Sequence, residues 1–151
     1  MKNNDIIRRL RFIVDVDDTV LQEFFRLGGC HLSLSDIADL LTTKTDSPCQ
    51  ECTDEQLTRF LDGFIIYRRG PSKEGLRNPV ALNNNVIMKK VRIALALEAR
   101  DLDNAFMLTD CEVSAHEISA LFRKPGTKHF VECTDEVLEK FFNGLSLYYR
   151  A

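Results

Sequence analysis

The chain has 151 residues, of which 44% are hydrophobic and 28% charged, and its formal net charge is −3. This balance predicts a globular protein with a buried core, and it excludes a fibrous or intrinsically disordered chain. Because the net charge is small and negative, binding to nucleic acid or to an anionic membrane would need a local basic patch. No apolar run approaches the ~20 residues that a membrane-spanning helix needs.

The first residues, MKNNDIIRRLRF, lack the apolar core and small-residue cleavage site of a signal peptide. The five cysteines are an odd number, which does not suit a disulfide framework. We therefore expect a cytoplasmic protein with reduced thiols and no membrane association.

The heptapeptide ECTDEQL at residues 51–57 returns as ECTDEVL at residues 132–138. The same shift of 81 positions aligns residues 3–69 with residues 84–150 without a gap. Between the aligned stretches lies GPSKEGLRNPVALN, which contains two glycines and two prolines and is typical of a linker. We infer an internal duplication with a first repeat at 1–69, a linker at 70–83 and a second repeat at 84–151.

Apolar residues recur at helical spacing in four segments of each repeat. The predicted helices are 4–15, 18–28, 34–42 and 54–69 in the first repeat, and 85–97, 99–109, 115–123 and 135–149 in the second. A 67-residue unit buries little surface by itself. The sequence thus predicts an all-α protein, with two tandem four-helix units packed about a pseudo-twofold axis.

Capping pairs support several of the predicted helix starts, because Ser or Thr at the N-cap and an acid or amide three residues later satisfy free backbone N–H groups. The pairs are Ser33 with Asp36, Ser114 with Glu117, and Thr53 with Gln56. The ECTDE motif is therefore interpreted as a helix start rather than as a catalytic group. The acids Asp15, Asp17 and Asp18 are likewise interpreted as capping and turn residues.

Gly63 and Gly144 occupy the same site in the fourth helix of each repeat. Glycine inside a helix costs about 1 kcal/mol relative to alanine. Its presence in both repeats suggests the close approach of another helix, with a kink as the alternative.

The cysteines offer an alternative metal site. Cys49 and Cys52 form a C-x-x-C motif, and with Cys30 and His31 they make a candidate zinc set. Against this, the second repeat has Phe130 and Glu112 in the places of Cys49 and His31. We favour structural cysteines and expect no cofactor; a redox pair is a further alternative.

Catalytic motifs are missing: there is no H-E-x-x-H, no G-x-S-x-G and no G-x-x-x-x-G-K-[ST]. The residues favour a non-enzymatic protein, and an enzyme with an unrecognised site stays an alternative.

Residues 118–131, ISALFRKPGTKHFV, are the largest chemical difference between the repeats. This stretch is basic and contains no acid, whereas the matching IADLLTTKTDSPCQ of the first repeat is nearly neutral. Basic side chains around a Pro-Gly turn suit an acidic ligand, nucleic acid included. The candidate ligand-binding residues are Arg123, Lys124, Lys128 and His129, with Arg69 and Arg150 as possible extensions.

Three other interpretations stay open. The basic stretch is also compatible with a solvated loop whose cations lie near a helix C-terminus. A protein–protein interaction or self-associating module is an alternative function. SLSDIADLL and SAHEISALF resemble the first helix of a helix-turn-helix, although the next predicted helix follows too late in the sequence.

Several stretches resemble the YehS-like family of bacterial proteins. They are NNDI at the start, FLDGFIIYRRG, LNNN, ISALFRKPGTKHFVECTDEVLEKFFNGL and the terminal YYR. The resemblance covers essentially the whole chain and includes the duplication. It implies a small cytoplasmic bacterial protein of an uncharacterised family, and it supplies no catalytic residues.

Overall fold

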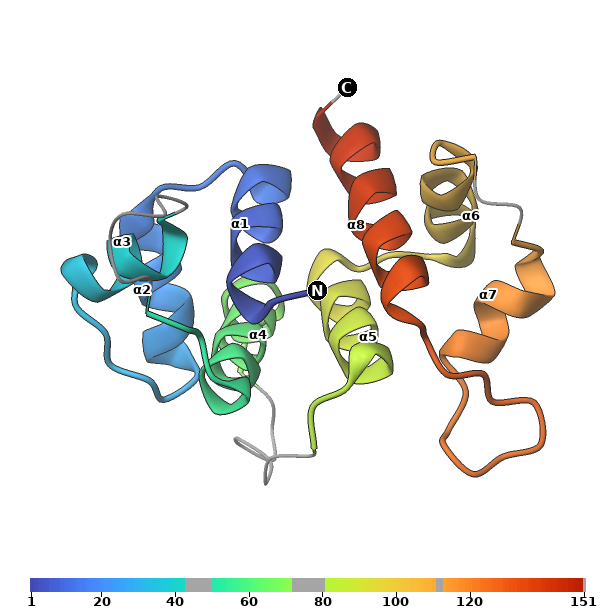
Figure 1. Cartoon of the computed structure of the whole chain (residues 1–151), viewed down its shortest axis with the longest axis horizontal. Coiled ribbons are helices and arrows are strands. Elements are labelled where there is room, and N and C mark those ends of the chain that lie inside the picture. The colour runs from blue at the N-terminus through green and yellow to red at the C-terminus, as the bar shows by residue number, and fades with distance from the viewer. Residues whose placement is uncertain (43–49, 72–80, 111–112, 151) are drawn as a thin grey trace. The chain divides into compact units, whose positions relative to one another are not determined.

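The computed structural model describes residues 1–42, 50–71, 81–110 and 113–150, which form eight α-helices and no strand (Figure 1). The all-α prediction is confirmed. The helices are α1 (Asn3–Val14), α2 (Asp18–Leu27), α3 (Leu34–Leu41), α4 (Asp54–Arg69), α5 (Asn84–Leu95), α6 (Ala99–Met107), α7 (Ala115–Leu121) and α8 (Asp135–Arg150). None of the helices in these described ranges is long and apolar enough to cross a membrane.

The chain divides into two compact units, Met1–Leu82 and Asn83–Ala151, with four helices each. Phenylalanine dominates both cores. In the first unit the ring of Phe24 on α2 stacks on that of Phe64 on α4, with 5.0 Å between the ring centroids. In the second unit the rings of Phe141 and Phe142, both on α8, lie 5.5 Å apart. All four side chains are fully buried, so each unit has its own apolar core.

Glycine lets α2 contact α4, and α6 contact α8, at the level of the backbone. A Cβ atom added to Gly63 would lie 1.6 Å from the carbonyl oxygen of Phe24, and one added to Gly144 would lie 2.1 Å from that of Ala105. The close approach predicted for these two glycines is confirmed. Gly28 at the end of α2 makes the same kind of contact, since its added Cβ would lie 1.8 Å from the carbonyl oxygen of Arg59.

The capping pairs of α3 and α4 are confirmed: Ser33 with Asp36 and Thr53 with Gln56 each exchange two hydrogen bonds. Two of the acids that follow α1 cap the next helix or form a local ion pair. Asp17 accepts a hydrogen bond from the backbone N–H of Val20 at 3.1 Å and so caps α2. Asp18 lies 3.2 Å from the guanidinium of Arg11.

Six of the eight helices end earlier than the sequence predicts, and three of them, α5, α6 and α7, end two residues earlier. α6 ends at Met107, where the hydroxyl of Thr109 donates to the carbonyl of Phe106 at 2.8 Å. α7 ends at Leu121. The carbonyl of Ala120 there accepts from the backbone N–H of Arg123 at 3.4 Å and from the distant backbone N–H of Val131 at 3.2 Å. The chain then leaves the helix and enters an extended loop.

Replacing Gly63 or Gly144 by alanine should destabilise its unit by about 2–4 kcal/mol, since the new methyl group would collide with a backbone carbonyl that cannot move without shifting a helix. Gly126→Ala is the control. Its Cβ would meet nothing within 4 Å, and only the positive φ of +88° opposes it, at about 1 kcal/mol. Urea unfolding followed by circular dichroism measures all three variants. Equal stability of the three would contradict the close approach.

Candidate functional site

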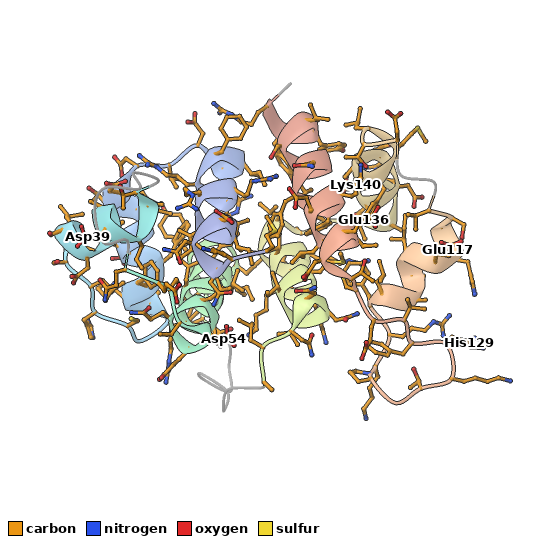
Figure 2. The ribbon with its side chains drawn as sticks, viewed as in Figure 1. Asp39, Asp54, Glu117, His129, Glu136 and Lys140 are labelled. Carbon is orange, nitrogen blue, oxygen red and sulfur yellow. The ribbon has the colours of Figure 1, made fainter. Side chains whose placement is uncertain are left out.

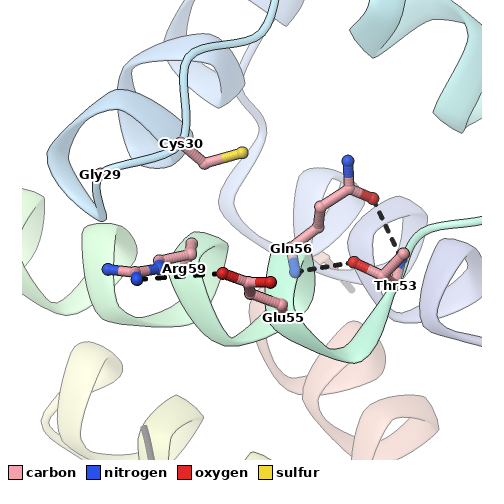
Figure 3. Close-up of a pocket in the computed structure, with 6 residues that line it drawn as sticks. All are labelled: Gly29, Cys30, Thr53, Glu55, Gln56 and Arg59. Atoms are coloured by element: carbon pink, nitrogen blue, oxygen red, sulfur yellow. Dashed lines mark hydrogen bonds and ion pairs between the residues drawn. The ribbon is translucent and has the colours of Figure 1, made fainter. Parts of the chain in front are cut away.

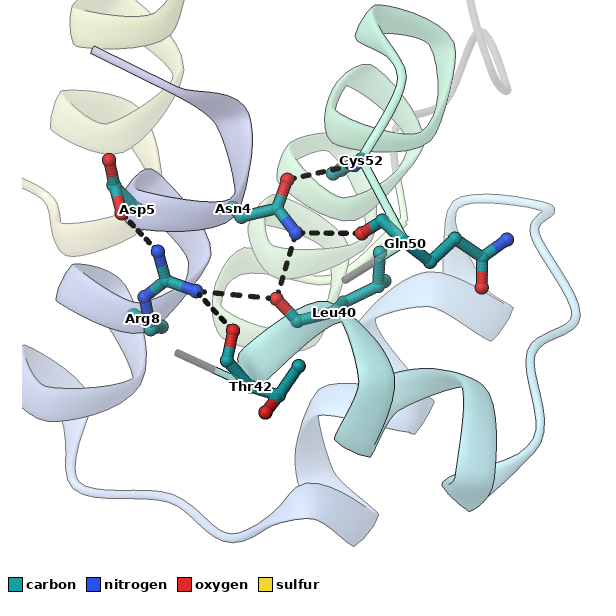
Figure 4. A network of polar contacts seen from close by, with 7 residues as sticks. All are labelled: Asn4, Asp5, Arg8, Leu40, Thr42, Gln50 and Cys52. Carbon is teal, nitrogen blue, oxygen red and sulfur yellow. Dashed lines mark hydrogen bonds and ion pairs between the residues drawn. The ribbon is translucent and has the colours of Figure 1, made fainter. Parts of the chain in front are cut away.

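The side chain of Asn4 on α1 joins three separate segments of the first unit (Figure 4). Its Nδ2 donates to the carbonyl oxygens of Leu40 and Gln50, both at 2.9 Å, and its Oδ1 accepts from the backbone N–H of Cys52 at 2.8 Å. Asn4 is only 6% exposed. These bonds fix the end of α3 and the approach to α4 against α1, because buried polar groups that lose such partners are costly.

The second unit repeats this arrangement with Asn85 on α5. Its Nδ2 donates to the carbonyls of Leu121 at 3.0 Å and Val131 at 2.9 Å, and its Oδ1 accepts from the N–H of Cys133 at 2.9 Å. We call the contacts of Asn4 and of Asn85 the asparagine clamps.

The preceding asparagine binds the helix start in both units. Asn3 donates to the carbonyl of Cys52 at 3.1 Å and to Asp54 at 2.8 Å. Asn84 makes the same bonds to Cys133 at 3.1 Å and Asp135 at 2.7 Å. The repeated Asn-Asn and ECTDE motifs are therefore partners in one structural contact.

The clamp of Asn85 holds both ends of the loop 122–130, which projects from the adjoining ends of α7 and α8 (Figure 1). Inside the loop the backbone N–H of Thr127 donates to the carbonyl of Lys124 at 3.2 Å, and that of Phe130 donates to Thr127 at 3.2 Å. Gly126 supplies the positive φ that this turn requires. The loop is thus an ordered turn with fixed ends.

Four basic side chains on this loop are exposed: Arg123, Lys124, Lys128 and His129. His129 lies at the outer edge of the second unit, near α7 (Figure 2). From α7, the ring of His116 comes within 6.3 Å of the ring of His129, measured between centroids. From α5, the guanidinium of Arg92 lies 4.6 Å above the ring of Phe122. The four predicted residues are therefore all exposed on one turn, and His116, which the sequence did not single out, approaches His129 from α7.

The two other predicted residues are not on this loop. Arg150 is the last residue of α8, whose first turn follows the loop, so about 22 Å of helix separates it from the basic turn. Arg69 ends α4 in the first unit. The candidate site of the second unit consequently rests on Arg123, Lys124, Lys128 and His129.

A shallow pocket of about 340 Å³ lies in the first unit, where the end of α2 faces the start of α4 (Figure 3). Its polar side chains pair with one another: Thr53 and Gln56 form the capping box, and Glu55 lies 4.0 Å from Arg59. The pocket is lined by Gly29, Cys30, Thr53, Glu55, Gln56 and Arg59. Burial raises the pKa of the Cys30 thiol, which makes it a weaker nucleophile at neutral pH. This arrangement offers no activated catalytic group.

The candidate zinc set is not assembled among the residues that the structure describes. Cys49 lies outside them, and the other three members, Cys30, His31 and Cys52, do not form a group able to hold a metal ion. Cys52 is buried, and burial raises the pKa of its thiol to about 12. Cys133 in the second unit has the same environment and a pKa also raised by burial to about 12. Both thiols are thereby suited to a core and unsuited to redox chemistry.

The helix-turn-helix resemblance does not extend to the geometry of the helices. Residues 122–134 separate α7 from α8, whereas the DNA-binding motif joins its two helices by a turn of about three or four residues.

Comparison with known proteins reproduces the duplication. The family model described as "Protein of unknown function (DUF1456)" matches twice, at residues 3–70 and 84–151. The chain is 34% identical over 148 residues to "Uncharacterized protein YehS" of Escherichia coli (strain K12), a match that covers 97% of this chain and 95% of that protein. No solved structure matches. The predicted resemblance and the tandem duplication are confirmed.

Asn85→Ala should destabilise the second unit by about 2–3 kcal/mol, because it leaves two carbonyls and one N–H without their partner. Asn84→Ala is the matched control and should cost about 1 kcal/mol or less, since it removes two hydrogen bonds instead of three and one of them is to the exposed carboxylate of Asp135. Urea unfolding compares the two, and hydrogen exchange should show faster exchange at Val131 and Cys133 only in Asn85→Ala. Equal effects of the two substitutions would argue against the clamp.

Cys52 and Cys133 should react with iodoacetamide at about pH 8 about a thousandfold more slowly than cysteines of the urea-unfolded chain, because only the thiolate reacts and their pKa values are near 12. The rate should rise with pH as the thiolate fraction grows. Mass spectrometry of the cysteine-containing peptides gives a rate for each residue. Labelling of Cys52 or Cys133 at the unfolded rate would contradict the burial of that thiol.

Proposed function

We propose that this chain, which belongs to the DUF1456 family of proteins of unknown function, is a non-enzymatic binding protein that engages nucleic acid through the loop 122–130 of its second unit. The observation that carries the proposal is the fixed loop itself. Its two ends are held by Asn85, and Arg123, Lys124, Lys128 and His129 are exposed on it. Binding residues are commonly placed in this way, on a loop that a rigid scaffold positions.

The charge of the loop supports an anionic ligand. Residues 118–131 contain no Asp or Glu, so the positive field of Arg123, Lys124 and Lys128 is not neutralised by an acid within the stretch. Arginine can bind a phosphate with two parallel hydrogen bonds, and lysine binds it as a compact point charge. Several cations close together suit a polyanion better than a single carboxylate, which favours nucleic acid over an acidic metabolite.

The first unit supports the assignment by contrast. Its clamp encloses a segment of the same length, but the matching stretch 37–50 holds a single cation, Lys44, and two acids, Asp39 and Asp46. The basic character is therefore a property of the second loop and is not required by the four-helix fold.

A protein partner is the second candidate function. Its support is a pair of exposed apolar side chains at the end of α6, where Met107 is 73% exposed and Leu108 is 50% exposed. Apolar groups of this size are more often covered than left in water, and they mark interaction surfaces when they cluster.

Fluorescence anisotropy with oligonucleotides of about 20 nucleotides, titrated across a salt series, tests the nucleic-acid proposal. We expect micromolar dissociation constants at low salt, weakening with salt at a log–log slope of up to about −2 for three phosphate contacts on a single strand. The triple variant Arg123→Ala, Lys124→Ala, Lys128→Ala should bind about a hundredfold more weakly and lose most of that slope.

A charge-matched control separates a local site from general electrostatic attraction. The triple variant Lys2→Ala, Lys89→Ala, Arg100→Ala also removes three exposed cations, none of them on the loop. Its affinity should fall by less than about threefold. Equal weakening by both triple variants would show that the loop is not the site. Lack of binding at low salt would remove nucleic acid as the ligand and leave a protein partner as the function to test.

A further inference from the structure

One group beside the basic loop has no part in the fold described above. His116 is exposed on α7, and its ring contacts that of His129, with centroids 6.3 Å apart and an angle of 69° between the ring planes. The first repeat has Ser35 and Pro48 at the corresponding positions. The histidine pair, like the basic loop, is present in the second unit and is not needed by the four-helix arrangement.

We propose that His116 is a further ligand-binding residue and that, with His129, it forms the part of the site whose positive charge depends on pH. Nucleic acid binding therefore strengthens as the pH falls below neutral. This inference rests on the proposed function, and it adds to it a residue from a different element and a mode of regulation.

The physical basis is the proximity of the two imidazoles. Histidine is the side chain that changes its charge between about pH 5 and 8. Two imidazolium rings in contact repel each other, whereas a phosphate near both rings attracts both charges and can accept a hydrogen bond from each. A bound phosphate therefore favours the protonated pair, and by linkage the protonated pair favours the bound phosphate.

The sign of the effect follows from the proton balance. The complex holds more protons than the free protein, so the affinity rises as the pH falls through the range in which the pair titrates. When both rings are protonated, the site carries two positive charges in addition to those of Arg123, Lys124 and Lys128. The number of phosphate groups that the site can contact rises accordingly.

The charged groups on the surrounding elements are of both signs. The loop carries permanent cations, and α6 and α7 carry acids. A bound phosphate neutralises the cations, which strengthens the coupling between binding and proton uptake. The charged residues on these elements are Glu117 on α7, Arg123, Lys124 and Lys128 on the loop, and Arg100, Asp101 and Asp103 on α6, the helix that packs on α7.

The test uses the full-length chain and an oligothymidylate of about 20 nucleotides, because neither thymine nor the phosphodiester titrates in the range of interest. Anisotropy is measured at constant low salt from about pH 5.5 to about pH 8. The double variant His116→Gln, His129→Gln removes the titrating pair and keeps polar side chains. His31→Gln is the matched control, because His31 is the exposed histidine of the first unit.

We expect the wild type and His31→Gln to bind at least about tenfold more tightly at the acid end than at the alkaline end, and the double variant to bind with nearly constant affinity. His116→Gln alone should remove about half of the pH dependence, on a logarithmic scale. Circular dichroism of each variant establishes that it is folded before binding is compared.

Two results would overturn the inference, and they differ from each other. In the first result, the loop binds in a salt-dependent way, but the affinity is equal at both ends of the pH range or the pH dependence survives in the double variant. This result would exclude the histidine pair and leave the proposed function intact. Lack of binding at every pH would overturn the proposed function together with the inference.

Discussion

The amides of Asn4 and Asn85 each donate two hydrogen bonds and accept one, and all six bonds are 2.8–3.0 Å long. Each amide connects the first helix of its unit to the end of the third helix and to the segment that enters the fourth. These segments would otherwise carry carbonyl and N–H groups without partners, since no regular secondary structure joins them. The asparagine side chain thus makes the hydrogen bonds that paired backbone segments would otherwise make. The position at which the following helix starts depends on these bonds.

The second constraint is the backbone contact at the glycines. At Gly63 and Gly144 the fourth helix of each unit lies against a carbonyl of the second helix, closer than any side chain would permit. The asparagine clamp fixes the N-terminal approach to this helix, and the glycine contact fixes its middle. Buried phenylalanines fill the remaining space. Two positional constraints on one helix leave it little freedom, which explains how units of so few residues maintain a defined core.

The sequence predicted features that depend on neighbouring residues, and it predicted the glycine contacts because they recur in both repeats, but it missed other features that depend on distant residues. The eight helices followed from the spacing of apolar residues, and the starts of α3 and α4 from Ser33 and Thr53. The end of α7 was misplaced by two residues; the carbonyl of Ala120 there also accepts from the backbone N–H of Val131, which lies beyond a loop. The four basic loop residues could be grouped since they lie within seven positions. His116 could not be joined to them from spacing, and Arg150 lies at the far end of α8, about 22 Å of helix from the loop. The only signal for His116 was that the other repeat lacks a histidine there.

The clamps also separate what each unit must keep from what it can change. Both enclose nine positions, 41–49 and 122–130, and both hold the flanking carbonyls through a side chain outside the loop. Substitutions within the loop 122–130 therefore have few routes by which to disturb the helices. After the duplication one copy could acquire a different surface chemistry while the other maintained the same architecture. A new binding specificity could thus be introduced into the loop 122–130 without redesign of the core.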